Sequence, residues 1–298
     1  MSDASDVEMN FDSIEYEIHT SPSVPNDLKG IIILCYNHDI QFRYRVVWIK
    51  LSNDSITDTL SSEFLRNFAL SVCCKVTPFS ANLFHLFDGS GKHLVPLGKL
   101  SNSQSTFLLR MIWKPRDLME LHDADPAALR YLYHQCHDDF VYGDTIERIS
   151  SKQRSLESLL GMVIFDMVAF ALNSEPKIEL KELRRRYHAK QFMNERILTD
   201  IEPIRRFKAF YRFINTIRIN HNCSENLGKH YRDFAGQGSE NSNEGALNVM
   251  LSFIKAITDS VPSYFVITGQ MADRDKMVVI DHPQNRIYVR HSDGSKAS

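Results

Sequence analysis

Two stretches with a helical hydrophobic pattern lie in the middle of the chain. In residues 129–141 the apolar positions recur at steps of three and four, which places them on one helical face, and Gly143 is a suitable helix stop. In residues 155–172 the apolar positions cover most of the helix circumference, so this helix is predicted to be buried nearly all round. A short polar connection separates the two stretches. The pattern predicts the centre of a helical domain.

The pattern upstream is of strand type, with one helix. Residues 31–36 form a continuous apolar run, and residues 43–51 alternate well enough to pair with it. An apolar stripe of helical spacing follows in residues 60–73 and ends before Pro78. Short apolar runs then occur at residues 83–87, 94–97 and 106–113. Two strands, one helix and further strands are the order of elements in a ubiquitin-like fold.

The C-terminal pattern is a helix followed by three strands. Apolar positions at helical spacing in residues 246–257 predict the last helix, and Pro262 interrupts the pattern. Strands are predicted at residues 264–268, 277–280 and 286–290. A domain with its own core needs on the order of 100 residues. Residues 262–298 are therefore expected to form only part of one.

The composition is that of an ordinary folded protein. The 298 residues are 43% hydrophobic and 24% charged, with a formal net charge of -2. Residues 1–29 hold seven acidic residues and one lysine and lack sustained periodicity, so we expect a disordered acidic leader. No run approaches the ~20 apolar residues of a membrane span, and the acidic N-terminus is unlike a secretory signal. A cytoplasmic protein is expected, or one held at a membrane by something else.

The cysteines give no framework of disulfides or zinc ligands. Their number is odd and no Cys-x-x-Cys spacing occurs. A reducing compartment is the expected location. The five are Cys35, Cys73, Cys74, Cys136 and Cys223.

A basic segment follows the central pair of helices. Residues 181–212 contain ten lysines and arginines against four acidic residues. Within it, residues 204–218 carry an apolar stripe of helical spacing, and most of the cations fall off that stripe. The pattern predicts an amphipathic helix with a basic face.

Several short segments resemble one known family. Residues 131–135 (YLYHQ), 138–143 (DDFVYG) and 160–167 (LGMVIFDM) are similar to the opening of the helical lobe in FERM modules, and specifically to that of the Janus family of receptor-associated tyrosine kinases. Residues 76–78 (VTP), followed by 83–86 (LFHL), resemble the same family's first lobe. Asp200, Glu202 and Pro203 depart from it, because the family tends to have further basic residues there. The resemblance covers residues 30–268.

The resemblance implies an α+β fold of FERM type. Residues 1–29 would be the leader and residues 30–115 a ubiquitin-like β-grasp lobe. Residues 116–261 would form a helical lobe like acyl-CoA-binding protein. Residues 262–298 would form a partial, pleckstrin-homology-like third lobe.

The resemblance also implies a function. In the Janus family the helical lobe binds the membrane-proximal cytoplasmic segment of cytokine-type receptors, within a non-receptor tyrosine kinase of JAK-STAT signalling. The same role here would place the chain at the inner face of membranes, through a receptor and with an anionic membrane surface nearby. No cofactor is implied.

The basic helix is the candidate for the receptor-peptide groove. Juxtamembrane peptides are short and apolar, so a groove needs aromatic walls, with cations at the rim to steer acidic partners and face anionic lipid. The candidate groove residues are Arg205, Arg206, Phe207, Lys208, Phe210, Arg212 and Phe213. The alternative is that these charges are the solvated face of an ordinary amphipathic helix.

The sequence carries no constellation that indicates catalysis. The Gly-rich loop, the catalytic His-Arg-Asp and the Asp-Phe-Gly of protein kinases are absent, so this chain is predicted not to be an enzyme. Residues 89–92 (GSGK) lack the spacing of a phosphate loop and are predicted to be a hairpin turn. One cluster of residues could suggest a metal site. We favour the alternative, in which the cysteine lies in the core and its neighbours are solvated. The residues concerned are His134, Cys136, His137, Asp138 and Asp139.

Two other functions stay open. The first is a FERM adaptor of the band 4.1 or focal-adhesion-kinase kind, which links membrane proteins or phosphoinositides to the cytoskeleton or to signalling. The second is nucleic-acid binding through the basic helix, which predicts an affinity that falls steeply with salt. The net charge of -2 and the lack of a second basic element argue against nucleic acid.

Overall fold

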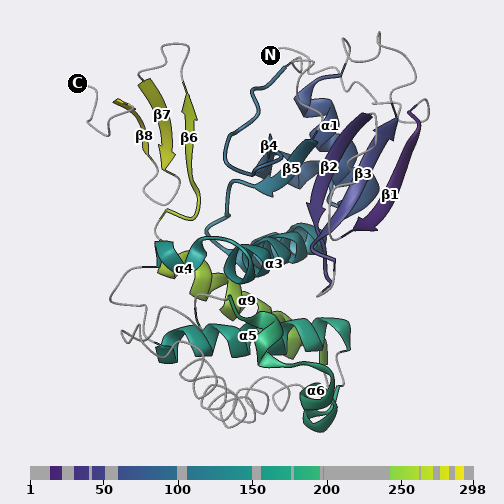
Figure 1. Cartoon of the computed structure of the whole chain (residues 1–298), viewed down its shortest axis with the longest axis vertical. Helices are drawn as coiled ribbons and strands as arrows, with labels where there is room; N and C mark the ends of the chain where they lie inside the picture. The colour runs from purple at the N-terminus through teal and green to yellow at the C-terminus, as the bar shows by residue number, and fades with distance from the viewer. Residues whose placement is uncertain are drawn as a thin grey trace, which may run out of the picture.

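The N-terminal part of the chain is built on a mixed sheet (Figure 1). The computed structural model describes residues 14–21, 30–39, 42–50, 60–98, 106–149, 156–175, 178–194, 197, 242–261, 263–270, 276–281 and 286–291. Within these ranges the sheet has five strands: β1 (Tyr16–Ser21), β2 (Gly30–Tyr36), β3 (Tyr44–Lys50), β4 (Phe84–Asp88) and β5 (Thr106–Met111). Their order is β1-β3-β2-β5-β4. Strands β2 and β5 are parallel at the centre, and the other neighbours are antiparallel.

One helix covers a face of this sheet. Helix α1 (Ser62–Ala69) begins at Ser61, whose hydroxyl accepts a hydrogen bond from the backbone N–H of Phe64 at 3.1 Å. It continues as a π-helical turn, η1 (Leu70–Cys74), and a 3-10 helix, η2 (Pro78–Leu83), leads into β4. Leu65 and Phe68 of α1 are fully buried. The predicted helix at 60–73 is confirmed, and so are the predicted strands at 31–36, 43–51, 83–87 and 106–113. The run at 94–97 supplies only the isolated bridge between Leu94 and Phe87.

Strand β1 lies within the range for which we expected an unstructured leader. It pairs antiparallel with β3, from Tyr16 opposite Ile49 to Ser21 opposite Tyr44. Lys50 lies 3.1 Å from a carboxylate oxygen of Glu15 and 2.7 Å from one of Glu17. The edge of β3 offers unpaired backbone groups, which a short segment can join without a hydrophobic pattern of its own. This pairing explains why the periodicity of residues 16–21 gave no signal.

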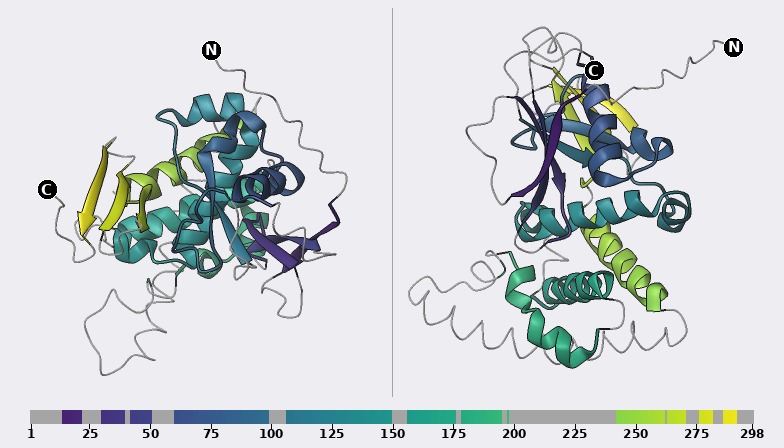
Figure 2. Two further views of the ribbon diagram at one scale, coloured as in Figure 1. Left: turned by 90° about the horizontal axis from the view of Figure 1, so that it is seen from above. Right: turned by 90° about the vertical axis from the view of Figure 1, so that its right-hand side faces the viewer.

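Helices make up the middle of the chain, and α3 lies between the sheet and the other long helices (Figures 1 and 2). Asp125 begins α3: one carboxylate oxygen accepts the N–H of Ala128 at 3.1 Å, and the other accepts the N–H and hydroxyl of Thr77 at 2.9 and 2.8 Å. This carboxylate therefore ties the start of α3 to the sheet region. The helices are α2 (Leu118–Ala124), α3 (Pro126–Val141), α4 (Thr145–Arg148), α5 (Leu156–Ser174), α6 (Leu180–Arg186), η3 (Ala189–Phe192) and α9 (Ser242–Ser260).

Helix α5 is the buried helix that the pattern predicts. Leu159, Val163 and Val168 are fully buried, and Leu160, Ile164 and Leu172 nearly so. Helix α9 packs along it. The predicted helices at 129–141, 155–172 and 246–257 are thus confirmed, and the mixed α+β class with them. The predicted helix at 204–218, with all seven candidate groove residues, lies outside the described residues.

A second sheet follows α9. Strands β6 (Val266–Gln270), β7 (Lys276–Asp281) and β8 (Arg286–His291) form an antiparallel meander in the order β6-β7-β8. Figure 1 shows it as a layer separate from the five-stranded sheet. The three predicted C-terminal strands are confirmed.

Candidate functional site

A cavity of about 1100 Å³ lies where the five-stranded sheet, the end of α3 and the start of β6 meet. Its wall is rich in charged and aromatic side chains that come from segments far apart in the sequence. Arg43 precedes β3, Arg110 lies on β5, Asp138 and Asp139 lie on α3, and Tyr264 precedes β6. The cavity therefore lies where three parts of the chain meet: the five-stranded sheet, the helices and the start of the second sheet. We call it the junction cavity.

Arg43 and Asp138 form the first ion pair of this junction. The guanidinium donates from Nε and Nη2 to the two carboxylate oxygens at 2.7 and 2.8 Å, in the bidentate geometry that favours such pairs. Its face also lies 4.4 Å from the ring centre of Tyr142. Burial raises the pKa of the Asp138 carboxyl, and Arg43 opposes that rise. Burial is also the largest influence on Arg43, but Asp138 outweighs it, and the pKa of the guanidinium is raised.

Arg110 and Asp139 form the second ion pair and connect three elements. Arg110 donates from Nη1 to Asp139 Oδ1 at 3.0 Å, and the phenol of Tyr264 donates to Asp139 Oδ2 at 2.7 Å. Tyr36 on β2 accepts from the same guanidinium. Burial disfavours the charge on Arg110, but Asp139 outweighs this and raises its pKa. One carboxylate thus joins α3 to β5 and to the segment before β6.

The remaining cations of the wall are Lys92 and Arg148. Arg148 donates to the carbonyl of Ser263 at 2.6 Å and lies 3.8 Å from Asp144. Four cations and three carboxylates line the cavity, and the two most buried cations are already paired. The cavity is therefore close to neutral, which makes it a weaker anion site than its arginines suggest.

A second polar cluster lies on the opposite side of α3. Asp166 of α5 accepts from the Tyr133 phenol at 2.9 Å and lies 2.6 Å from Nδ1 of His137. Burial alone would lower the pKa of His137, but the Asp166 carboxylate outweighs it and raises that pKa. These contacts fix α5 against α3.

His38 lies near this cluster and could suggest catalysis, because its Nε2 is 2.9 Å from the Ser174 hydroxyl. Its other ring nitrogen, Nδ1, is buried and has no hydrogen-bond partner among the described residues, so none of their carboxylates orients the ring as a catalytic triad requires. Burial lowers the pKa of His38 to about 4, which makes it a poor base near neutral pH. The pair is not arranged as a nucleophile and its base.

The residues considered as a metal site contact partners from other elements instead. Cys136 is buried in the core as expected, but the expectation that its neighbours are solvated is wrong. Asp139 is only 15% exposed and paired with an arginine of β5, and His134 is only partly exposed. Asp138 and His137 are each 6% exposed, and each is paired with a residue from another element. The helical pattern could not reveal these partners, because one lies just before β3 and the other on α5.

The turn at residues 89–92 has the geometry of a hairpin turn, as predicted. Asp88 accepts hydrogen bonds from the backbone N–H groups of Lys92 and His93 at 3.0 and 3.1 Å, and from the Ser90 hydroxyl at 2.8 Å. The N–H groups that a phosphate would need are therefore bound to a carboxylate. This excludes a phosphate loop.

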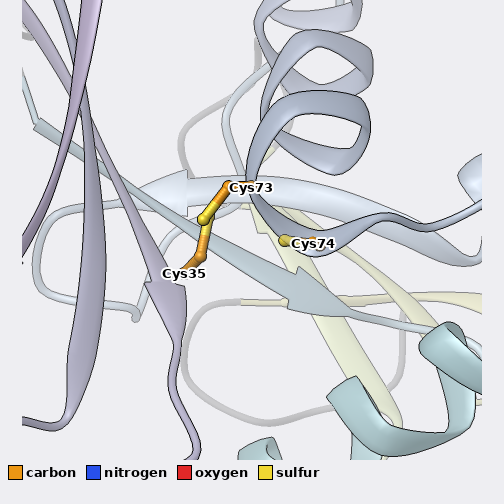
Figure 3. A group of neighbouring side chains, drawn as sticks. All are labelled: Cys35, Cys73 and Cys74. Carbon is orange, nitrogen blue, oxygen red and sulfur yellow. The ribbon is translucent and has the colours of Figure 1, made fainter.

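Three cysteines, which the sequence analysis left unassigned, are brought together. Cys35 lies near the C-terminal end of β2, and Cys73 and Cys74 are the last two residues of η1 (Figure 3). Hydrogen bonds from the thiols of Cys35 and Cys74, with Arg45 and Lys75 nearby, lower the pKa of Cys73. The only sequence signal was the adjacent pair Cys73–Cys74, because Cys35 comes from a distant strand.

Comparison with known proteins assigns no family to the chain. No family model and no curated protein matches the chain. Among solved structures, the MyTH4-FERM MF2 domain of Dictyostelium discoideum myosin VII (mutant 1) is similar with a TM-score of 0.46 and 10% sequence identity. The match covers 91% of this chain and 52% of that one, so the chain spans about half of that structure's length. Among the described helices, none combines the length and apolar character needed to cross a bilayer.

Proposed function

We propose that this chain is a non-catalytic FERM region that docks the membrane-proximal cytoplasmic segment of a cytokine-type receptor. The observation that carries the proposal is the topology. A sheet with parallel strands β2 and β5 at its centre and helix α1 packed on one face supports a β-grasp arrangement, as in a ubiquitin-like lobe. A helical region and an antiparallel sheet then follow along the chain, in the order of the lobes of a FERM module.

The segments that resemble the Janus family support the proposal through their positions. Gln135, Asp138 and Asp139 are motif residues, and all three bind groups of the five-stranded sheet region. Thr77 of the VTP segment binds Asp125 at the start of α3. The resemblance thus falls on the contacts that join the first two parts of the molecule, which is where a multi-lobe module needs specific residues.

The docking surface that we propose is the basic, Phe-rich segment at 205–213. A receptor segment rich in proline and apolar residues would pack on its aromatic side chains, and the cations would face acidic residues or anionic lipid. A longer protein that contains this chain would in this proposal carry the kinase, which the docking region places at a receptor.

Fluorescence-polarisation titration with a panel of cytokine-receptor juxtamembrane peptides tests this function. We expect saturable micromolar or tighter binding that is lost with a scrambled peptide and weakened by Phe207→Ala and by Arg212→Glu. Phe79→Ala and Arg116→Glu are matched controls, because both side chains are exposed at other places, Phe79 to 81%. Absence of binding to every peptide by a folded sample would refute the receptor-docking proposal, and equal losses in the controls would refute the groove.

The adaptor alternative is favoured by one observation, the two cations of the junction cavity's wall, Lys92 and Arg148, that lie outside its two buried ion pairs. An anionic phosphoinositide headgroup would bind there through Lys92 and Arg148, since Arg43 and Arg110 are held by carboxylates. Sedimentation with vesicles that contain phosphatidylinositol bisphosphate tests it. Binding that Lys92→Glu with Arg148→Glu abolishes would support the adaptor, and binding indifferent to both changes would exclude this cavity.

A further inference from the structure

Three free cysteine thiols converge between the sheet and the end of η1. The sulfur atoms of Cys35, Cys73 and Cys74 all lie within 4.8 Å of one another. Cys35 and Cys73 are 0% and 2% exposed, and Cys74 is partly exposed. Figure 3 shows Cys35 and Cys73 pointing toward each other from β2 and from the helix end, with Cys74 beside them. The cluster is buried, yet one member reaches the surface.

The backbone that carries Cys73 and Cys74 departs from a regular helix. In an α-helix successive side chains diverge by about 100°, so adjacent residues do not normally face one partner. Here residues 70–74 form a π-helical turn, and the N–H groups of Lys75 and Val76 both donate to the carbonyl of Leu70. Lys75 has φ = 59°, the single positive φ of a non-glycine residue in the part of the chain that the structure describes. Such turns and such backbone angles concentrate at functional sites.

A cation links the two segments of the cluster. Arg45 on β3 is the cross-strand neighbour of Cys35, and its guanidinium donates to the carbonyl of Cys73 at 3.1 Å. Lys75 follows Cys74 directly. Two positive charges therefore lie close to a group of sulfur atoms, which favours sulfur in the thiolate form that binds metals.

We propose that Cys35, Cys73 and Cys74 form a binding site for a soft, thiophilic metal ion, Cu(I), coordinated by three sulfur atoms. Metal–sulfur bonds of about 2.3 Å place three sulfurs around one ion about 4 Å apart, so the side chains need to move by less than about 1 Å. Thiolates select Cu(I) and Zn²⁺ among biological metals. Zn²⁺ in a structural site takes four ligands, whereas among the described residues no fourth His, Cys, Asp or Glu joins this group. Copper binds here as Cu(I) without a change of oxidation state, and each thiol that becomes a ligand releases its proton.

Two other occupations of the cluster give different results. The cysteines could be plain core residues, since a free cysteine packs like a small apolar side chain. Cys35 and Cys73 could instead form a disulfide under oxidising conditions. Plain core residues would leave even the reduced protein without affinity for Cu(I), whereas a disulfide would remove that affinity only from the oxidised protein.

Titration of the reduced chain with Cu(I), held by a chromophoric chelator, tests the site. We expect one equivalent of Cu(I) to transfer to the protein, with a thiolate-to-copper absorption band in the ultraviolet. Cys35→Ala, Cys73→Ala and Cys74→Ala should each weaken binding by about 10- to 100-fold or more, because each removes one ligand. Cys136→Ala is the matched control, since it removes a buried thiol outside the cluster and should leave the affinity unchanged.

The partly exposed Cys74 keeps the test decisive if the variants of the buried cysteines do not fold. The thermal unfolding temperature of the wild type should rise with Cu(I), and that of Cys74→Ala should not, while circular dichroism shows both to be folded. Equal Cu(I) affinity of the wild type and Cys74→Ala, or loss of binding in Cys136→Ala alone, would overturn the proposal. So would a reduced wild type that takes up no Cu(I).

Discussion

The two sides of helix α3 meet their neighbours through different chemistry. Toward α9 the contact is aromatic, with the ring of Phe253 packed 5.7 Å from that of Tyr133 and 6.0 Å from that of Phe140. Toward the sheet the ring contacts of Tyr131 are joined by hydrogen bonds, with Gln135 and Asp139 bound to β5. An apolar contact is stabilising in many arrangements, whereas a hydrogen-bonded contact is satisfied in few. The side that faces α9 therefore adds stability, and the side that faces the sheet fixes the position of α3.

Gln135 shows how the polar side sets that position. Its side-chain amide accepts from the N–H of Met111 at 2.8 Å and donates to the carbonyl of the same residue at 3.1 Å, as a neighbouring strand would do. The phenol of Tyr131 donates to the carbonyl of Leu109 at 2.7 Å. A shift of α3 along β5 by one residue would break both contacts. The first two parts of the chain are therefore locked in one register.

The largest effect is expected on the aromatic side, from Phe253→Ala. Phe253 is fully buried, and truncation of such a ring costs about 3–5 kcal/mol through lost burial and the cavity that remains. Urea unfolding at neutral pH measures the difference. Phe79→Ala, at a site 81% exposed, should change stability by less than about 0.5 kcal/mol. Similar costs for the two changes would contradict the packing described for α9.

A somewhat smaller effect is expected on the polar side, from Asp139→Ala. The change leaves the charge of Arg110 without its partner, and both side chains are largely buried, at 15% and 18% exposure. Removal of one partner from such a pair costs about 3 kcal/mol. Asp144→Ala, whose carboxylate is 70% exposed beside Arg148, should cost less than about 1 kcal/mol under the same denaturant protocol. An unchanged free energy of unfolding in Asp139→Ala would show that this ion pair does not hold α3 in position.

The smallest effect is expected from pH, at the ring of His38. Burial lowers its pKa to about 4 in the folded state, against about 6.5 in the unfolded chain. The unfolded state therefore binds this proton first, and the stability from neutral His38 is present above pH 6.5 and lost as pH falls toward 4. Between pH 7 and pH 5 this loss is about 1–2 kcal/mol. His137, whose pKa is raised, works in the opposite sense: its stabilisation is present below pH 6.5 and is lost as pH rises through its folded pKa.

His38→Gln separates the contribution of His38 from that of His137. Because glutamine does not titrate, the variant should lose less stability than the wild type when unfolding is measured at pH 7 and pH 5. Equal losses in the two proteins would mean that the pKa of His38 is the same in the folded and unfolded states. The remaining acid sensitivity of the variant would then belong to other groups.

The hydrophobic pattern of the sequence predicts some parts of the fold and not others. Helix α5 and strands β2, β3 and β5 follow from hydrophobic period alone, because the apolar positions that define the pattern are the ones that become buried. The partners of Asp139 do not follow, since Tyr264 is 125 residues away and nothing local marks the pair. Strand β1 is not predicted either, because its pairing depends on the edge of β3 and not on its own hydrophobic pattern.

The candidate sites divide in the same way. A basic helix at 204–218 is predicted from charge and spacing and lies outside the described residues, and the receptor groove proposed at 205–213 stays a prediction. The thiol cluster was not visible, since Cys35 and Cys73 meet only after β2 and η1 have packed together. The junction cavity was hidden too, because its wall combines side chains from strands, a helix and the segment before β6. Local periodicity predicts the elements, and long-range polar contacts decide which side chains meet.

A double-mutant cycle between Arg110 and Asp139 tests most directly the claim that polar contacts of α3 hold the parts of the molecule in one arrangement. Urea unfolding would be measured for the wild type, Arg110→Ala, Asp139→Ala and the double variant. Because each single change leaves a buried group unpaired, we expect a coupling energy of at least about 1.5 kcal/mol. The double variant should then lose less stability than the sum of the two single losses. A coupling energy below about 0.5 kcal/mol, with additive losses, would contradict it.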